Sequence, residues 1–227
     1  MKNSVDGKLI IMTLTRYLLV LVFVGLLIFL PAGSLNFRNG WLFIGALFIP
    51  MIFVMIYLLI KDPDLLEKRM KTKEKEKPQK VYLVLSIIVS IITFILPGLD
   101  YRFHWSSVPF WVVILSTVLM ITGYAMFFLV MKQDSYASRV IEIQEDQKLI
   151  DTGLYSLVRH PMYFSATLLY FFAPLILGSY YAMIPMIFIP VLLVIRIKNE
   201  EKVLLEGLKD YDLYMKKVKY RLIPYIW

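Results

Sequence analysis

Long apolar runs constrain this chain more than any other feature of its sequence. Six segments are dominated by aliphatic and aromatic residues: 11–31, 41–60, 81–97, 109–131, 163–177 and 182–195. The first four approach the roughly 20 residues that a helix needs to cross the hydrocarbon of a bilayer. The last two are shorter and are separated by Gly178 and Ser179, so we interpret them as a helical hairpin. The sequence predicts an all-α integral membrane protein with about six transmembrane helices.

Basic residues indicate how these helices are oriented. Eight lysines and arginines fall in 61–80, four in 132–159, eight after residue 195 and three near the N-terminus, whereas the alternate loops hold only Arg38 and Arg102. Cytoplasmic loops are enriched in lysine and arginine. We therefore expect a multi-pass protein of the cell membrane, surrounded by lipids, with both termini in the cytoplasm. The mixed-charge loop 61–80 is interpreted as a solvated connector.

The composition argues against several kinds of site. The chain has no cysteine, which excludes disulfides, zinc thiolates and a cysteine nucleophile. His104 and His160 are its only histidines, so no metal site is expected. The net charge of +8 belongs to a membrane protein and does not by itself indicate nucleic acid, which we do not expect as a partner. No G-x-G-x-x-G motif follows a strand, so a Rossmann-type nucleotide site is not expected.

The polar part of the sequence lies in two blocks that flank the predicted hairpin, at 133–163 and 196–227. Their charge puts both on the cytoplasmic side, and the hairpin returns the chain to that side. A site can therefore form between them at the membrane surface. We divide the chain accordingly into four N-terminal transmembrane helices, residues 1–131, and a second region, residues 132–227, with a cytoplasmic segment, the hairpin and a cytoplasmic C-terminal helix.

The first block ends in Arg159, His160 and Pro161, where the fifth apolar segment begins. The sequence Asp-Thr-Gly at 151–153 predicts a turn, because glycine tolerates positive φ. Pro161 fixes its own φ and disfavours helical geometry at His160, so Pro161 is expected in the first helical turn with His160 as a cap. Backbone N–H groups exposed there would favour an anion. Alternatively, Arg159 reaches lipid headgroups and His160 merely ends a loop.

The second block places Arg196 and Glu200 on one helix face, because they are four residues apart. Glu201 lies next to that face. The pair could be an ordinary surface ion pair, but it follows directly on the sixth apolar segment and should face the cytoplasmic end of the bundle. A stripe at helix-like spacing comes after it and is interpreted as a packing face: Tyr211, Tyr214, Val218 and Leu222.

These two blocks resemble the isoprenylcysteine carboxyl methyltransferase family of integral membrane methyltransferases. The resemblance rests on "GLYSLVRHPMY" at 153–163, "LILGS" at 175–179, "RIKNEE" at 196–201 and "YDLYMKKVKYRLIP" at 211–224, and it covers roughly the last 95 residues. It implies an enzyme with a cytoplasmic cofactor pocket for S-adenosylmethionine. The methyl acceptor would be a carboxylate of the isoprenylcysteine type or another lipophilic or small molecule.

The resemblance also implies roles for individual residues. Arg196 matches the substrate-binding position, and Arg196 and Glu200 are the expected catalytic pair. A further polar contact falls near Glu142, although the spacing there differs. The positions that match the cofactor site are Gln147, Lys148, Leu149, Ile150, Tyr155, His160, Pro161, Met162, Tyr163 and Glu200.

These residue types suit methyl transfer, which needs two reactants aligned at close range in a site that excludes water. The Glu200 carboxylate can hold a cationic or hydroxyl-bearing part of the cofactor. Arg196 can bind a carboxylate through two parallel hydrogen bonds. A carboxylate acceptor is already ionised at neutral pH, so no strong general base is needed.

Other functions stay open at this point. Membrane sterol reductases resemble the same C-terminal half and bind NADPH there, and phospholipid amines and small thiols are alternative methyl acceptors. A non-catalytic transporter subunit would need charged residues inside its spans, and no aspartate, glutamate or lysine lies in the middle of the six segments. The sequence does not indicate an oligomeric state.

Overall fold

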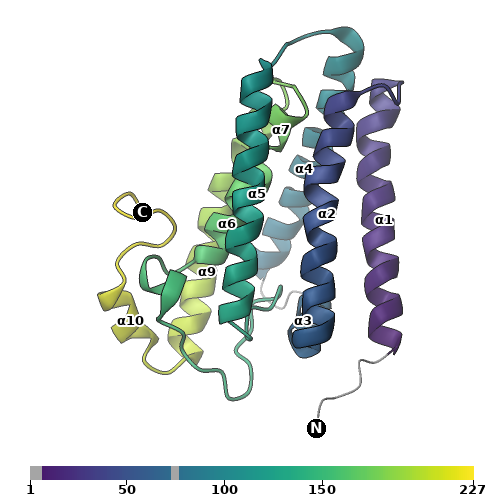
Figure 1. Ribbon diagram of the computed structural model, residues 1–227. Helices are drawn as coiled ribbons and strands as arrows, with labels where there is room; N and C mark the ends of the chain where they lie inside the picture. The colour runs from purple at the N-terminus through teal and green to yellow at the C-terminus, as the bar shows by residue number, and fades with distance from the viewer. Residues whose placement is uncertain (1–6, 73–76) are drawn as a thin grey trace.

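Long helices make up most of the molecule (Figure 1). The computed structural model describes residues 7–72 and 77–227, and every regular element in these ranges is helical, which confirms the all-α prediction. Four helices in the described part are long and apolar enough to cross a membrane: α1 (Gly7–Ala32), α2 (Arg38–Lys61), α4 (Lys77–Phe103) and α5 (Phe110–Gln133). They correspond to the first four predicted segments.

The predicted fifth and sixth spans form shorter, interrupted helices. The fifth is divided into α6 (Pro161–Phe171) and α7 (Ala173–Ile176), and the sixth into α8 (Met183–Met186) and α9 (Phe188–Gly207). Proline cannot donate a backbone hydrogen bond, and each division lies within three residues of a proline. The C-terminal half of α9 is strongly charged. The count of six spans therefore stays a prediction.

A tight turn joins α7 to α8 at the end of the molecule opposite α3 and α10 (Figure 1). Gly178 adopts a φ of +81° in this turn. The adjacent Ser179 hydroxyl donates a hydrogen bond of 2.5 Å to the buried Asp100 carboxylate, which ties the turn to the end of α4. The two arms that leave the turn diverge: α6 and α7 pack along α5, whereas α8 and α9 pack mainly along α4. The tight hairpin of the sequence interpretation is therefore not confirmed.

Two glycines let neighbouring helices approach closely. A Cβ atom on Gly98 would lie 2.5 Å from the Ile28 carbonyl oxygen, at the contact between α4 and α1. A Cβ atom on Gly123 would lie 2.8 Å from the Leu169 amide nitrogen, at the contact between α5 and α6. Small residues at helix contacts are typical of membrane bundles, where close backbone packing replaces the hydrophobic effect. Helices from both predicted regions thus pack in one bundle, and the division at residue 131 stays a prediction.

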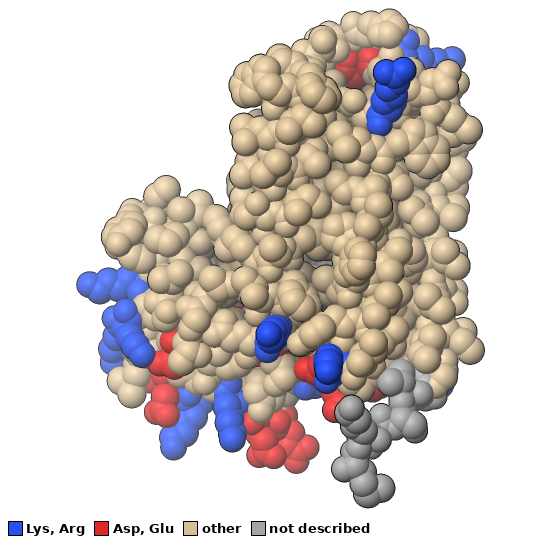
Figure 2. All heavy atoms as spheres, viewed as in Figure 1, with Lys and Arg blue, Asp and Glu red and all other residues tan. Residues whose placement is uncertain are grey.

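Apolar side chains cover the outer face of the long helices. Ile11, Phe53 and Phe110 are exposed to 69%, 69% and 76%. Figure 2 shows an almost uncharged shaft, with charged residues gathered at the end that holds α3 and α10 and a smaller group at the opposite end. A charge-free belt of this kind matches the hydrocarbon of a bilayer. The protein is a membrane protein, as predicted; the sides on which its termini lie stay predictions.

The loop 61–80 is not merely a solvated connector, so that interpretation was wrong for its first part. Residues Pro63–Met70 form helix α3, which begins at a proline and is capped by the Asp62 carboxylate, 3.0 Å from the Leu65 amide. Leu65 and Leu66 are buried under the bundle. A short amphipathic helix is stable here because packing, and not the propensity of eight residues, holds it. The prediction for residues 73–76 lies outside the described ranges.

Candidate active site

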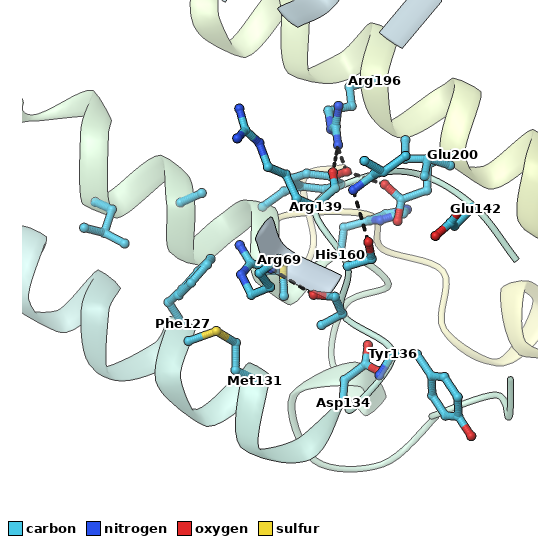
Figure 3. A pocket seen from close by; sticks show the side chains of 18 of the residues that line it. Arg69, Phe127, Met131, Asp134, Tyr136, Arg139, Glu142, His160, Arg196 and Glu200 are labelled. Carbon is cyan, nitrogen blue, oxygen red and sulfur yellow. Dashed lines mark hydrogen bonds between the residues drawn. The ribbon is translucent and has the colours of Figure 1, made fainter. Parts of the chain in front are cut away.

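A cavity of about 710 Å³ lies at the charged end of the bundle (Figure 3). Its walls come from α1 to α6, from α9 and α10, and from the irregular segment between α5 and α6. Binding sites for small molecules have volumes of about 300–1,000 Å³. The cavity is therefore large enough for a nucleoside-sized cofactor together with part of a second ligand.

Nearly all predicted site residues line this one cavity. They are Gln147, Lys148, Leu149, Ile150, Tyr155, His160, Met162, Tyr163, Arg196 and Glu200, and Glu142 lines it as well. Pro161 is buried at the first position of α6, where a proline loses nothing because that N–H has no partner within the helix. The structure thus brings the two polar blocks together, as the sequence predicted. The roles of these residues stay predictions.

Arg159 lies inside the protein and is only 5% exposed. Its Nε donates to Glu201 Oε1 at 2.7 Å, and its Nη1 donates to the carbonyl oxygens of Val218 and Lys219 at 2.7 and 2.9 Å. The alternative in which Arg159 reaches lipid headgroups is therefore wrong. Three acceptors within the fold already bind the guanidinium group, so an interaction with lipid headgroups would offer it no additional stabilisation.

Glu201 is the centre of a buried polar cluster. In addition to Arg159, its carboxylate lies 3.3 Å from His160 Nε2 and accepts a 2.7 Å hydrogen bond from Arg221 Nε. Burial alone would raise the pKa of Glu201, but the hydrogen bonds from His160, Arg159 and Arg221 outweigh it and lower the pKa to about 2. The sequence analysis placed Glu201 only beside the expected site. A buried arginine beside a histidine requires a nearby carboxylate, and this requirement could have pointed to Glu201.

The N–H groups of the first two motif residues are engaged within the fold and are not available to an anion; the expectation for the remaining N–H groups at the start of α6 stays a prediction. The N–H groups of Arg159 and His160 donate to the carbonyl oxygens of Tyr220 and Arg221 at 2.9 and 2.8 Å. The C-terminal segment therefore runs along the motif like a short paired strand. Together with the Glu201 cluster, these bonds fix the orientation of the His160 ring, which borders the cavity.

Tyr163 connects the two residues of the expected catalytic pair. Its hydroxyl accepts a 2.9 Å hydrogen bond from Arg196 Nε and donates to Glu200 Oε2. Arg196 also donates to Gln79 Oε1 and to the Arg139 carbonyl oxygen, each at 2.8 Å. Arg196 therefore fixes α4, α6 and the segment after α5 in one arrangement, in addition to any role towards a substrate.

A second tyrosine–carboxylate pair lies across the cavity. The Tyr155 hydroxyl donates to Asp134 Oδ2 at 2.7 Å, and the Tyr136 amide donates to Asp134 Oδ1 at 2.8 Å. Burial raises the pKa of Asp134 despite these bonds. Burial, followed by the charge of Asp134, raises the pKa of Tyr155 well above its ordinary value. Both groups are thus held in place as hydrogen-bond partners.

The predicted packing face after α9 is confirmed in its first three residues. Tyr211 and Tyr214 belong to α10 (Tyr211–Lys217), and with Val218 they form a buried cluster against Leu149. The Tyr214 hydroxyl also donates to the Tyr155 carbonyl oxygen at 2.7 Å, within the 3-10 helix η1 (Gly153–Ser156). This cluster gives the cavity an apolar wall beside its polar groups.

Four charged residues of the cavity wall were missed by the sequence analysis: Arg16, Arg69, Asp134 and Arg139. Arg69 lies on α3, in the loop that was interpreted as solvated. Asp134 and Arg139 follow α5 directly, at the start of the first polar block. No spacing in the sequence shows that they turn inward, because contacts across the bundle determine their direction.

The fold and the cavity define an all-helical membrane protein with a polar site at one end of its apolar shaft. Residues 113–206 match the family model described as Isoprenylcysteine carboxyl methyltransferase (ICMT) family. The matched region runs from the beginning of α5 almost to the end of α9, and the match supports a membrane methyltransferase of that family. The resemblance predicted from the sequence is confirmed, and the reductase alternative is not favoured. No curated protein gives a significant match to the chain.

Proposed function

We propose that the protein transfers a methyl group from S-adenosylmethionine to a carboxylate of a lipophilic acceptor at the cytoplasmic face of the membrane. One observation carries this proposal. The residues that match the family's cofactor and substrate positions come from three separate stretches of the chain and line a single cavity. That cavity lies at the charged end of a membrane bundle, where a water-soluble cofactor and a lipid-soluble acceptor can both arrive.

The chemistry of the cavity fits the cofactor. Among the described residues, the Glu200 carboxylate accepts one hydrogen bond, from Tyr163, so it keeps acceptor capacity for ribose hydroxyls or an amine. Leu149, Tyr211 and Tyr214 offer an apolar wall for a purine ring. Lys148 is exposed and lines the same cavity, where it can face a carboxylate. When bound, S-adenosylmethionine supplies a methyl group on a positively charged sulfur.

The chain's own residues would align the reactants. Arg196 and Glu200 are held at fixed positions through Tyr163, so an acceptor carboxylate beside Arg196 would lie close to a cofactor held at Glu200. Holding two reactants in this way can supply much of a rate enhancement. The deeper part of the cavity is apolar, with walls that include Val54, Leu83 and Phe127, so it can exclude water and take a lipophilic tail.

The test is transfer of a radioactive methyl group by the purified protein in bilayers, with a membrane lipid extract and an S-prenylated N-acylcysteine as acceptors. Methyl esters release methanol in base, whereas methylated amines and thioethers do not. We expect base-labile label from the wild type. Because charge-assisted hydrogen bonds contribute about 1.5–3 kcal/mol, Glu200→Ala should lower the rate at least about tenfold. The matched control is Glu206→Gln, on the exposed end of the same helix.

The chemical form of the product decides between acceptors. A base-stable label would show that the methylated group is an amine or a thiol and not a carboxylate. If the wild type binds the cofactor but labels neither acceptor preparation, the proposal of a lipophilic carboxylate is contradicted.

A further inference from the structure

Arg69 is a positively charged group in the cavity wall, and no carboxylate in the described part of the chain contacts it. Its Nη1 donates to the Ala137 carbonyl oxygen at 2.9 Å, and its guanidinium lies 4.9 Å from the centre of the Phe127 ring. Within the described ranges it forms no ion pair. Burial is the main cause that lowers the pKa of Arg69 to about 10, and the charge of Arg139 acts in the same direction. The side chain carries its full charge at neutral pH, and a partly buried charge without a carboxylate in contact is unfavourable.

Arg139 brings a second guanidinium to the same cavity (Figure 3). Its backbone is fixed, because its carbonyl oxygen accepts from Arg196 Nη2 at 2.8 Å. Its side chain is exposed and makes no hydrogen bond or ion pair with any residue that the structure describes. Both guanidinium groups line this one cavity and carry the same charge, so they repel each other. An anion that contacts both would replace this repulsion with attraction.

The acidic groups of the cavity are already engaged with other partners. Asp134 accepts from Tyr155 and from a backbone amide. Glu142 pairs with Lys71 at 2.7 Å, and Glu200 accepts from Tyr163. None of them forms an ion pair with Arg69 or Arg139. Asp134 acts on Arg69 only through space. An anionic ligand would supply the direct contact with a negative charge that both arginines lack among the described residues.

The surroundings of the two arginines indicate the kind of ligand. Arg69 stands between the polar end of the cavity and the apolar walls of α2 and α5, where Met162 Sδ and the Phe127 ring are its neighbours. Beyond it, Met51, Val54 and Met55 continue the lining into the bundle. A ligand whose anionic group contacts Arg69 can extend an apolar chain in this direction. The site thus suits an amphiphile and not a free inorganic anion.

We propose that Arg69 and Arg139 bind a phosphate or carboxylate group of the methyl acceptor, distinct from the group that is methylated. The inference rests on the proposed function, in which Arg196, joined through Tyr163 to Glu200, faces the reacting carboxylate. The acceptor is then an amphiphile with two anionic groups, one at Arg196 and one at the Arg69–Arg139 site.

The test uses dodecyl phosphate as a probe, titrated into the full-length protein in a neutral detergent and followed by calorimetry, with dodecylphosphocholine as a probe of low net charge. Each lost charge-assisted contact should weaken binding by about tenfold or more. We expect this loss for Arg69→Gln and for Arg139→Gln, and no change for Arg102→Gln at the other end of the bundle. Arg139→Gln removes no side-chain hydrogen bond or ion pair with a described residue, so misfolding is not expected to explain its effect. Arg69→Lys should restore part of the binding.

S-adenosylhomocysteine binding and methyl transfer, measured on the same variants, separate the possible outcomes. We expect unchanged S-adenosylhomocysteine binding, and competitive inhibition by dodecyl phosphate against the acceptor. If the variants instead lose S-adenosylhomocysteine binding, the arginines hold the cofactor, and our assignment is wrong. Non-competitive inhibition by dodecyl phosphate would indicate that the arginines bind a lipid headgroup outside the acceptor site, which would contradict the proposal. Equal binding of dodecyl phosphate to the wild type and to all variants would also contradict it. If the wild-type protein does not bind S-adenosylhomocysteine, the proposed function itself is refuted, independently of the two arginines.

Discussion

Replacing Glu201 with glutamine is expected to lower the free energy of unfolding by about 3–5 kcal/mol, because it leaves the buried Arg159 guanidinium without its counter-ion. Arg159, His160 and Arg221 all converge on this 4%-exposed side chain. For a chain of this size the melting temperature should fall by roughly 10 °C. Thermal unfolding of the detergent-purified protein, followed by tryptophan fluorescence, measures the change. Because His160 borders the cavity, S-adenosylhomocysteine binding should weaken as well.

The pH dependence of stability gives the same variant an independent readout. The pKa of Glu201 is about 2 in the fold and 4.5 without the fold's influence. Its stabilising contribution is therefore complete above pH 4.5 and is lost as the pH falls towards 2. Glu201→Gln should remove that part of the pH dependence. Glu206→Gln, an exposed change on the same helix, should stay within about 0.5 kcal/mol of the wild type. A Glu201→Gln protein that melts like the wild type at neutral pH would contradict this account.

Replacing Arg196 with lysine is expected to lower the rate of methyl transfer by roughly a hundredfold, the effect of a misplacement of about 1 Å in an aligned site. Arg196 holds Tyr163, Gln79 and the Arg139 carbonyl with separate N–H groups. A lysine keeps the charge but cannot reproduce this planar fork. We therefore expect kcat to fall much more than the affinity for S-adenosylhomocysteine, because Glu200 is retained.

The control for Arg196→Lys is Lys198→Gln, an exposed change two residues away on α9. Both proteins are compared per folded molecule, because Arg196 is buried. If Arg196→Lys transfers methyl groups at nearly the wild-type rate, charge alone is sufficient, and the positioning role that we assign to its three contacts is wrong.

Local signals in the sequence predict those parts of this protein that depend on local chemistry. Hydropathy and length identify α1, α2, α4 and α5. Gly153 adopts positive φ in the predicted turn, and Pro161 begins α6. The cavity-lining residues of the two polar blocks followed from the family motifs. In each case a short stretch of sequence carries the information.

Long-range contacts determine what the sequence did not show. Glu201 becomes the centre of a cluster only because Arg159 and Arg221 reach it from distant parts of the chain. Arg69 faces the cavity only because α3 folds under the bundle. Similarly, the arms after Gly178 diverge because α4 and α5 offer them separate surfaces. Patterns of hydropathy and charge do not encode such pairings.

Binding of S-adenosylhomocysteine to the purified wild-type protein, measured by calorimetry with NADPH as the control, tests whether the cavity is a methyltransferase site. We expect binding of the adenosyl ligand, weakened at least about tenfold by Glu200→Ala and by His160→Ala, and no binding of NADPH. Glu206→Gln should bind like the wild type. NADPH binding without S-adenosylhomocysteine binding would contradict the account and identify the cavity as a reductase site. Binding that is unaffected by the Glu200 and His160 variants would contradict the assigned location.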